Sequence, residues 1–152
     1  MALFAILRAG CAAVPIDGEY PKERVKTILE DVGCALCITT AEKAADTEGA
    51  PLMILEEIFP ENADEPEGDT GLDLSDPDTE GYILYTSGST GKPKGVVHRQ
   101  AMLNNAPEVL GSVTKFTENS RSLNIAGFSF IAGTFDTIPV LTSGGSVYIA
   151  NE

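Results

Sequence analysis

The sequence predicts an α/β fold in which a layered, largely parallel sheet carries flanking helices. Short apolar runs of strand length alternate with amphipathic helical segments, and this alternation is typical of parallel α/β proteins. Hydrophobic residues make up 43% of the 152 residues, which is enough for a core and too many for a disordered chain. No apolar run approaches the ~18–20 residues of a membrane span, so we expect no membrane insertion.

The expected elements follow one another along the chain. Residues 2–8 favour a short helix that ends at Gly10, and residues 12–16 are typical of a buried strand. Pro21 suits the first turn of a helix whose apolar side chains recur at helical spacing up to Gly33. The later patterns predict strands at 35–40, 52–55, 82–85, 122–126 and 146–150, and helical segments at 42–45, 99–110 and 135–141.

The negative charge is concentrated in one segment. The net charge is −13, and residues 56–80 hold eleven of the 23 acidic residues and no basic one. We interpret the chain as one domain, residues 1–152, with an acidic surface loop at 56–80; a docking site for a basic partner is the alternative. So acidic a chain cannot neutralise many phosphates, which excludes a general nucleic-acid binder.

The three cysteines do not indicate a disulfide framework, because their number is small and odd. Cys34 and Cys37 have the spacing of a zinc motif, but the chain has one histidine and no second cysteine pair. We therefore predict no metal site and interpret both as buried small side chains. The apolar N-terminus lacks a preceding basic residue and is interrupted by Arg8, unlike a signal peptide. A reducing, cytoplasmic location is expected.

A loop rich in glycine, hydroxyl groups and lysine follows the expected strand at 82–85, between that strand and the next helix. Ligands of α/β proteins bind at this end of a strand, and glycine backbone, exposed N–H groups and lysines suit phosphate oxygens. The loop is not a Walker A motif, because Thr86 stands at the first glycine position and Pro93 at the magnesium-binding position. A flexible linker is the alternative. The candidate phosphate-binding residues are Thr86, Ser87, Gly88, Ser89, Thr90, Gly91, Lys92 and Lys94.

Two segments resemble known motifs. Tyr82–Val96, with the sequence YILYTSGSTGKPKGV, closely resembles the signature of the AMP-binding, adenylate-forming superfamily. Ala5–Asp17, followed by Tyr20, Pro21 and Arg24, is similar to an upstream motif of the adenylation domains of nonribosomal peptide synthetases. The two motifs occur in the family's order. The chain thus resembles an incomplete N-terminal part of an adenylation domain.

The resemblance implies an ATP-dependent ligase. Such an enzyme joins a carboxylic acid to AMP with loss of pyrophosphate, and the acyl group then passes to the phosphopantetheine thiol of a carrier protein domain. The loop of residues 86–94 would hold the β- and γ-phosphates, with Lys92 and Lys94 as its principal charges. An acyl-CoA synthetase-like ligase and a non-catalytic nucleotide-binding or interaction module are the alternatives.

A third segment resembles part of the family's acid-binding pocket. Ungapped matching through Gly144 and Gly145 places Ile131 where amino-acid-activating members carry an aspartate that pairs with the substrate ammonium. Isoleucine cannot pair with a buried cation, so we hypothesise a keto, hydroxy or aryl acid as substrate. Ala132 and Phe135 would line the same pocket. A gapped alternative would use Phe135 and Asp136 as the family's Phe-Asp pair.

The resemblance also implies that catalytic groups are missing. The family's magnesium-associated acid, ribose-binding aspartate and terminal catalytic lysine have no counterpart in these residues, so we expect no catalytic residue and no Mg²⁺ ligand within the chain. Catalysis depends on groups acting together, and the chain alone is expected to be inactive. Apolar faces that lack packing partners would stay exposed.

Overall fold

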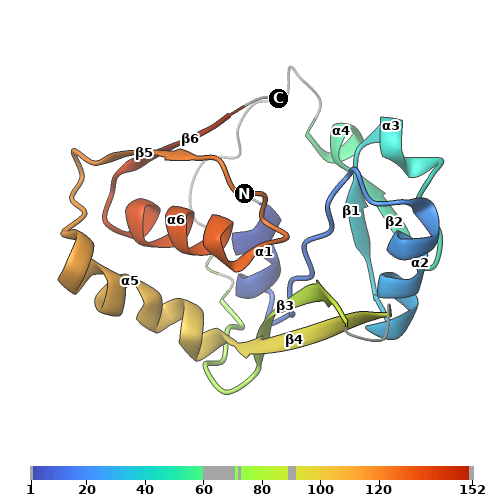
Figure 1. Cartoon of the computed structure of the whole chain (residues 1–152), viewed down its shortest axis with the longest axis horizontal. Coiled ribbons are helices and arrows are strands. Elements are labelled where there is room, and N and C mark those ends of the chain that lie inside the picture. The colour runs from blue at the N-terminus through green and yellow to red at the C-terminus, as the bar shows by residue number, and fades with distance from the viewer. Residues whose placement is uncertain (1, 60–70, 72, 89–91, 151–152) are drawn as a thin grey trace.

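The computed structural model describes residues 2–59, 71, 73–88 and 92–150, and their elements alternate between helix and strand (Figure 1). The fold class is α/β, as the sequence predicts. No helix of the described residues is long and apolar enough to cross a membrane. The helices are α1 (Ala2–Arg8), α2 (Lys22–Asp31), α3 (Ala41–Ala44), α4 (Leu55–Ile58), α5 (Gln100–Thr114) and α6 (Ile131–Thr142). The strands are β1 (Cys37–Thr39), β2 (Leu52–Ile54), β3 (Glu80–Ser87), β4 (Pro93–Arg99), β5 (Arg121–Asn124) and β6 (Ser146–Ile149).

The strands pair in three two-stranded sheets. In the two parallel sheets, β1 pairs with β2 and β5 pairs with β6. A helix connects the strands of each parallel pair, α3 in the first and α6 in the second, because parallel neighbours need a crossover. The third sheet is an antiparallel hairpin of β3 and β4. The largely parallel pairing therefore holds for two of the three sheets.

The expected strand at residues 12–16 is not formed. Only Ala13 pairs with β3: its N–H donates to the Gly81 carbonyl at 2.9 Å, and its carbonyl accepts from the Ile83 N–H at 2.9 Å. Pro15 lacks an N–H group and cannot extend this ladder. The prediction was wrong because Pro15, two residues after Ala13, limits this apolar run to a single bridge.

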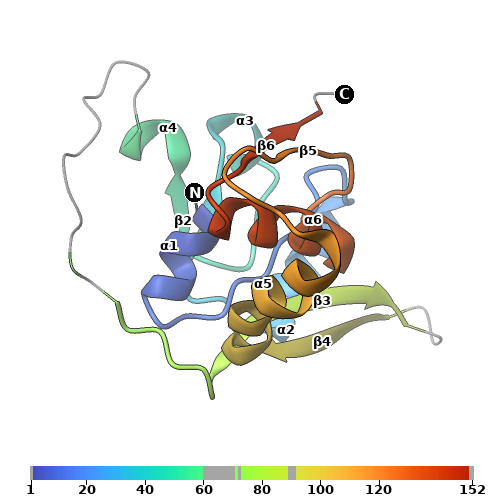
Figure 2. The ribbon, with the colours of Figure 1, turned by 90° about the vertical axis from the view of Figure 1, so that its left-hand side faces the viewer.

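The predicted order of strand, long loop and helix around Thr86 is also different. Strand β4 lies between the loop and α5, and it returns alongside β3 with Ser87 opposite Pro93 (Figure 2). β4 pairs through its backbone and leaves most of its side chains exposed, so it has no continuous apolar run. The candidate phosphate loop is consequently the tip of a hairpin.

The main core lies between α1, β3, α5 and α6. Its buried side chains are Ala13, Tyr82, Leu84, Leu103 and Ile138. The apolar face of α1 packs against them through Leu3, Phe4, Ile6 and Leu7. Gly10, with φ of 72°, ends α1 as expected, because a residue with a side chain is disfavoured at positive φ.

Helix α2 belongs to a second group of elements with β1, β2 and α3, on the right of Figure 1. Ile28 and Leu29 are its buried residues. On the opposite, polar face, Lys22 pairs with Asp46 at 2.5 Å and Lys26 with Glu48 at 3.2 Å. These pairs are exposed, so each contributes little stability.

The acidic segment at 56–80 is only partly described. Its first residues belong to α4, where the Glu56 carboxylate accepts the N–H of Ala41 at 3.0 Å and so caps α3. Residues 60–70 and 72 lie outside the described residues. Beyond them the Leu74 N–H donates to the Arg8 carbonyl at 2.7 Å, so the end of the segment is attached to α1.

All three cysteines are free thiols. Cys11 is exposed, whereas Cys34 and Cys37 are half-buried and so less enclosed than expected. Burial, and then the nearby Cys34, raises the pKa of the Cys37 thiol, which favours its unreactive protonated form.

Candidate functional site

The tip of the β3–β4 hairpin is closed by backbone and hydroxyl contacts. The Gly88 N–H donates to the Lys92 carbonyl at 3.1 Å, and the Thr86 hydroxyl donates to the Lys94 carbonyl at 3.4 Å. A Cβ atom on Gly88 would lie 2.3 Å from the Lys92 carbonyl oxygen. Glycine at position 88 is thus required for the two strands to approach this closely.

Most residues of the described part of the tip are exposed to solvent. Thr86, Ser87, Lys92 and Lys94 are exposed, and Gly88 is half-buried. Ser89, Thr90 and Gly91, the other predicted phosphate-binding residues, lie outside the described residues. The described part of the tip therefore presents hydroxyl and ammonium donors to solvent, as an anion-binding loop requires.

Below the tip, Tyr85 joins the hairpin to helix α2. Its ring lies over Gly95 of the neighbouring strand, where an added Cβ would be 3.2 Å from the ring Cζ. Its hydroxyl donates to the Asp31 carboxylate at 2.5 Å. Burial, and then the hydrogen bond and charge of Asp31, raises the pKa of Tyr85 to about 12, so the phenol stays protonated near neutral pH.

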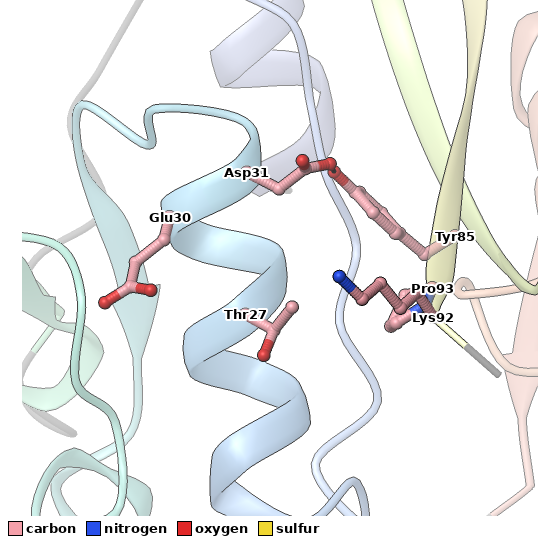
Figure 3. A pocket seen from close by; sticks show the side chains of 6 residues that line it. All are labelled: Thr27, Glu30, Asp31, Tyr85, Lys92 and Pro93. Atoms are coloured by element: carbon pink, nitrogen blue, oxygen red, sulfur yellow. Dashed lines mark hydrogen bonds between the residues drawn. The ribbon is translucent and has the colours of Figure 1, made fainter. Parts of the chain in front are cut away.

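A cavity of about 630 Å³ lies between α2 and the hairpin (Figure 3). Thr27, Glu30 and Asp31 line it from α2, and Tyr85, Lys92 and Pro93 line it from the hairpin. The Lys92 side chain extends into this space toward α2, below the bond between Tyr85 and Asp31 (Figure 3). The backbone of Lys92 thus belongs to the hairpin tip, whereas its side chain lines the cavity between the hairpin and α2.

The three candidate substrate-pocket residues, Ile131, Ala132 and Phe135, all lie on α6 but have different surroundings. Ile131 packs against the main core, and Ala132 is exposed. Phe135 lines a second cavity of about 380 Å³ with residues of α5: Met102, Asn105, Val109 and Leu110. Asp136, the aspartate of the gapped alternative, is exposed. In the described residues the three side chains do not line one common cavity.

Two buried hydrogen-bond networks hold α6, and the sequence patterns did not single out their residues. The Asn124 amide donates to the Gly133 carbonyl at 3.1 Å and to the Thr137 hydroxyl at 2.8 Å. The Tyr82 hydroxyl donates to the Phe128 carbonyl at 2.7 Å and accepts from the Thr134 hydroxyl at 2.7 Å. In the sequence, Asn124 is one polar residue in a predicted strand, and such residues are too common to indicate a hydrogen-bond network.

The bond between Asp31 and Tyr85 was also missed. Its partners are 54 positions apart, and Asp31 resembles any acidic residue at the end of a polar helix face. Among the described residues, no group of three His, Cys, Asp or Glu side chains could hold a metal ion.

Comparisons with known proteins identify the family of the chain. The model of the family described as "AMP-binding enzyme" matches residues 1–152. The chain is 32% identical to nonribosomal peptide synthetase ecdA of Aspergillus rugulosus over 100% of the chain and 2% of that protein. It is 33% identical to gramicidin S synthase 1 of Brevibacillus brevis over 97% of the chain and 14% of that protein.

The solved structures lead to the same family. The nonribosomal peptide synthetase FmoA3, in its AMPPNP-bound form, superposes with a TM-score of 0.81 at 27% identity, over 99% of this chain and 16% of that one. The N-terminal subdomain of Klebsiella oxytoca NpsA superposes with a TM-score of 0.76 at 25% identity, over 98% of this chain and 38% of that one. The chain thus spans a small part of each relative. Since the family model covers its whole length, the chain belongs to the AMP-binding enzyme family.

Proposed function

We propose that this chain forms part of an adenylate-forming ligase of nonribosomal peptide synthesis, and that its hairpin tip binds the β- and γ-phosphates of ATP. The supporting observation is the glycine-dependent closure of the tip, which leaves Thr86, Ser87, Lys92 and Lys94 exposed. The AMPPNP-bound form of FmoA3 adds support, because it is a family member solved with a triphosphate analogue.

In the proposed reaction, a carboxylate oxygen of the acid attacks the α-phosphorus of ATP. The bond from that phosphorus to the bridging oxygen breaks, and its electron pair leaves with pyrophosphate. The negative charge that develops on the leaving group is stabilised by the N–H, hydroxyl and ammonium donors of the tip. In the second step the sulfur of a carrier phosphopantetheine thiol attacks the acyl carbon, the bond from that carbon to the phosphate oxygen breaks, AMP leaves with the electron pair, and the thiol proton passes to solvent.

We expect Lys92→Ala and Lys94→Ala, made in the full-length protein that contains this chain, to slow acid-dependent exchange of pyrophosphate into ATP. Loss of one such donor costs ~2.7–4 kcal/mol of transition-state stabilisation, about 10²- to 10³-fold in rate. Lys115→Ala is the matched control, because this exposed lysine lies at the far end of α5 from the hairpin. Undiminished exchange in both loop variants would contradict the proposed role of the tip.

We further propose that the acid lacks a free α-ammonium group, so that a keto, hydroxy or aryl acid is the substrate. The support is the isoleucine at position 131, since an apolar side chain cannot compensate a buried cation. In the same exchange assay, we expect the full-length protein to prefer a keto or hydroxy acid over the α-amino acid with the same side chain. Preference for the amino acid would overturn this proposal and favour Asp136 as the ammonium partner.

A further inference from the structure

We propose that Asp31 and Tyr85 are positioning residues: their hydrogen bond fixes the hairpin tip relative to α2, and so sets where the tip meets the phosphates of ATP. This inference rests on the proposed function of the tip. It adds two residues, one on α2 and one on β3, that need not touch the nucleotide.

The hydrogen bond between Asp31 and Tyr85 lies at the edge of a cavity. It joins a helix and a strand from two groups of elements along one side of the 630 Å³ cavity (Figure 3). Across the empty space of a cavity, side chains make no van der Waals contacts that could hold its two walls at a fixed distance. A direct polar link at its edge therefore constrains the distance between α2 and the hairpin where packing does not.

Tyr85 connects this hydrogen bond to the hairpin tip. Tyr85 is two residues before Ser87, the last residue of β3, and its ring lies over Gly95 of β4. The phenol thus contacts both strands of the hairpin while its hydroxyl is held by α2. Lys92 begins at the tip and extends into the same cavity. A shift of the Tyr85 ring would move the backbone that carries the tip.

Loss of the bond between Asp31 and Tyr85 should change the position of the hairpin more than the stability of the protein. Asp31 is exposed, so its carboxylate can be hydrated when the phenol hydroxyl is removed. The penalty of a buried unpaired charge is then avoided. We therefore expect loss of the bond to loosen the hairpin while the protein stays folded.

The test compares Tyr85→Phe, Asp31→Ala, their combination, and Asp31→Asn in the full-length protein. Asparagine keeps an oxygen that accepts the phenol hydrogen bond, so Asp31→Asn should behave nearly as the unaltered protein. Glu30→Ala is the matched control, because Glu30 is the neighbouring acid on α2 and lines the same cavity. KM for ATP, KM for the acid and kcat are measured by pyrophosphate exchange, and unfolding is followed in urea.

We expect Tyr85→Phe and Asp31→Ala each to raise KM for ATP about tenfold, because a tenfold change corresponds to the loss of one charge-assisted hydrogen bond. The combined variant should also show about tenfold, because both changes remove the same bond. KM for the acid and the urea midpoint should stay nearly constant in all variants. Glu30→Ala should leave KM for ATP unchanged.

A second readout needs no activity. Amide hydrogen exchange at Lys92, Lys94 and Gly95 should become faster in Tyr85→Phe and Asp31→Ala, and stay unchanged in Asp31→Asn and Glu30→Ala. The proposal is overturned if the effects of the two single changes on KM multiply in the combined variant, if Glu30→Ala matches Asp31→Ala, or if exchange at these three amides is unaffected. Failure of the proposed function is distinct, because then Lys92→Ala and Lys94→Ala would leave pyrophosphate exchange unchanged.

Discussion

At the scale of single residues, the hairpin depends on a tyrosine with two functions. The ring of Tyr85 covers Gly95, and its hydroxyl is bonded to Asp31. Glycine in a strand is weakening because it has no side chain to pack. The aromatic ring on the opposite strand covers this gap, as cross-strand pairs do elsewhere.

The raised pKa of Tyr85 predicts a loss of stability at high pH. The folded value is about 12, against an ordinary value of 10.0. Above about pH 10 the unfolded chain loses this proton while the folded chain keeps it, so the free energy of unfolding falls as pH rises from about 10 to about 12. We expect the unaltered chain and Tyr85→Phe to have nearly equal urea midpoints near neutral pH, and the midpoint of the unaltered chain to fall below that of Tyr85→Phe between about pH 10 and about pH 12. A difference that is constant over this range would contradict the prediction.

The sequence singles out Gly88, Lys92 and Lys94 as candidates because glycine and lysine have direct chemical meanings in a loop. The structure gives a reason for the glycine, and the phosphate-binding role of the lysines stays a prediction. Asp31 was not identified, since its role depends on a partner 54 positions away. A residue whose function comes from a distant contact leaves no local pattern in one sequence.

At the scale of elements, helix α6 depends on how closely the preceding loop approaches it. A Cβ atom on Gly133 would lie 2.6 Å from the carbonyl oxygens of Ala126 and Gly127. The Gly133 carbonyl in turn accepts from the Asn124 amide and the Thr137 hydroxyl. The glycine thus allows the loop after β5 to lie directly against the first turn of α6.

We expect Gly133→Ala to lower the free energy of unfolding by about 1–3 kcal/mol, because the methyl group would overpack this contact. Gly127→Ala is the matched control: its Cβ would meet only Ser129 Oγ at 3.5 Å and Phe130 Cδ2 at 4.0 Å. We expect that change to stay within about 0.5 kcal/mol. Urea denaturation of both variants measures the difference, and equal destabilisation would show that the contact does not matter.

Most elements were predicted with boundaries within a few residues, because helical spacing and glycine stops are local signals. The segment around Ala13, helix α4 and the return strand β4 were not: α4 occupies the start of the segment interpreted from the sequence as a loop. Ala13 makes one bridge beside a proline, and β4 pairs by its backbone with exposed side chains. Pairing of this kind is decided by the neighbouring strand, which the residues of the segment do not encode.

At the scale of the whole molecule, the described residues form three two-stranded sheets that do not join into one sheet, and β3 is the strand that contributes side chains to the main core. Apolar side chains remain exposed in several parts of the molecule, including Ile125 at 80%, Val113 at 80% and Leu36 at 44%. The sequence anticipates such faces. It does not locate them, since which face of a strand or helix stays uncovered is decided by tertiary packing.

Helix α1 is synthesised before the elements that cover it, because its apolar face packs against Leu103 and Ile138. Leu103 and Ile138 follow the end of the helix by about 95 and about 130 residues. Until they are synthesised, the apolar face of α1 lacks these two partners, and slow, long-range closure is the expected course of folding. A nascent chain halted before α5 should be a good client for a chaperone that binds short apolar helices, and a poor one once α6 has emerged.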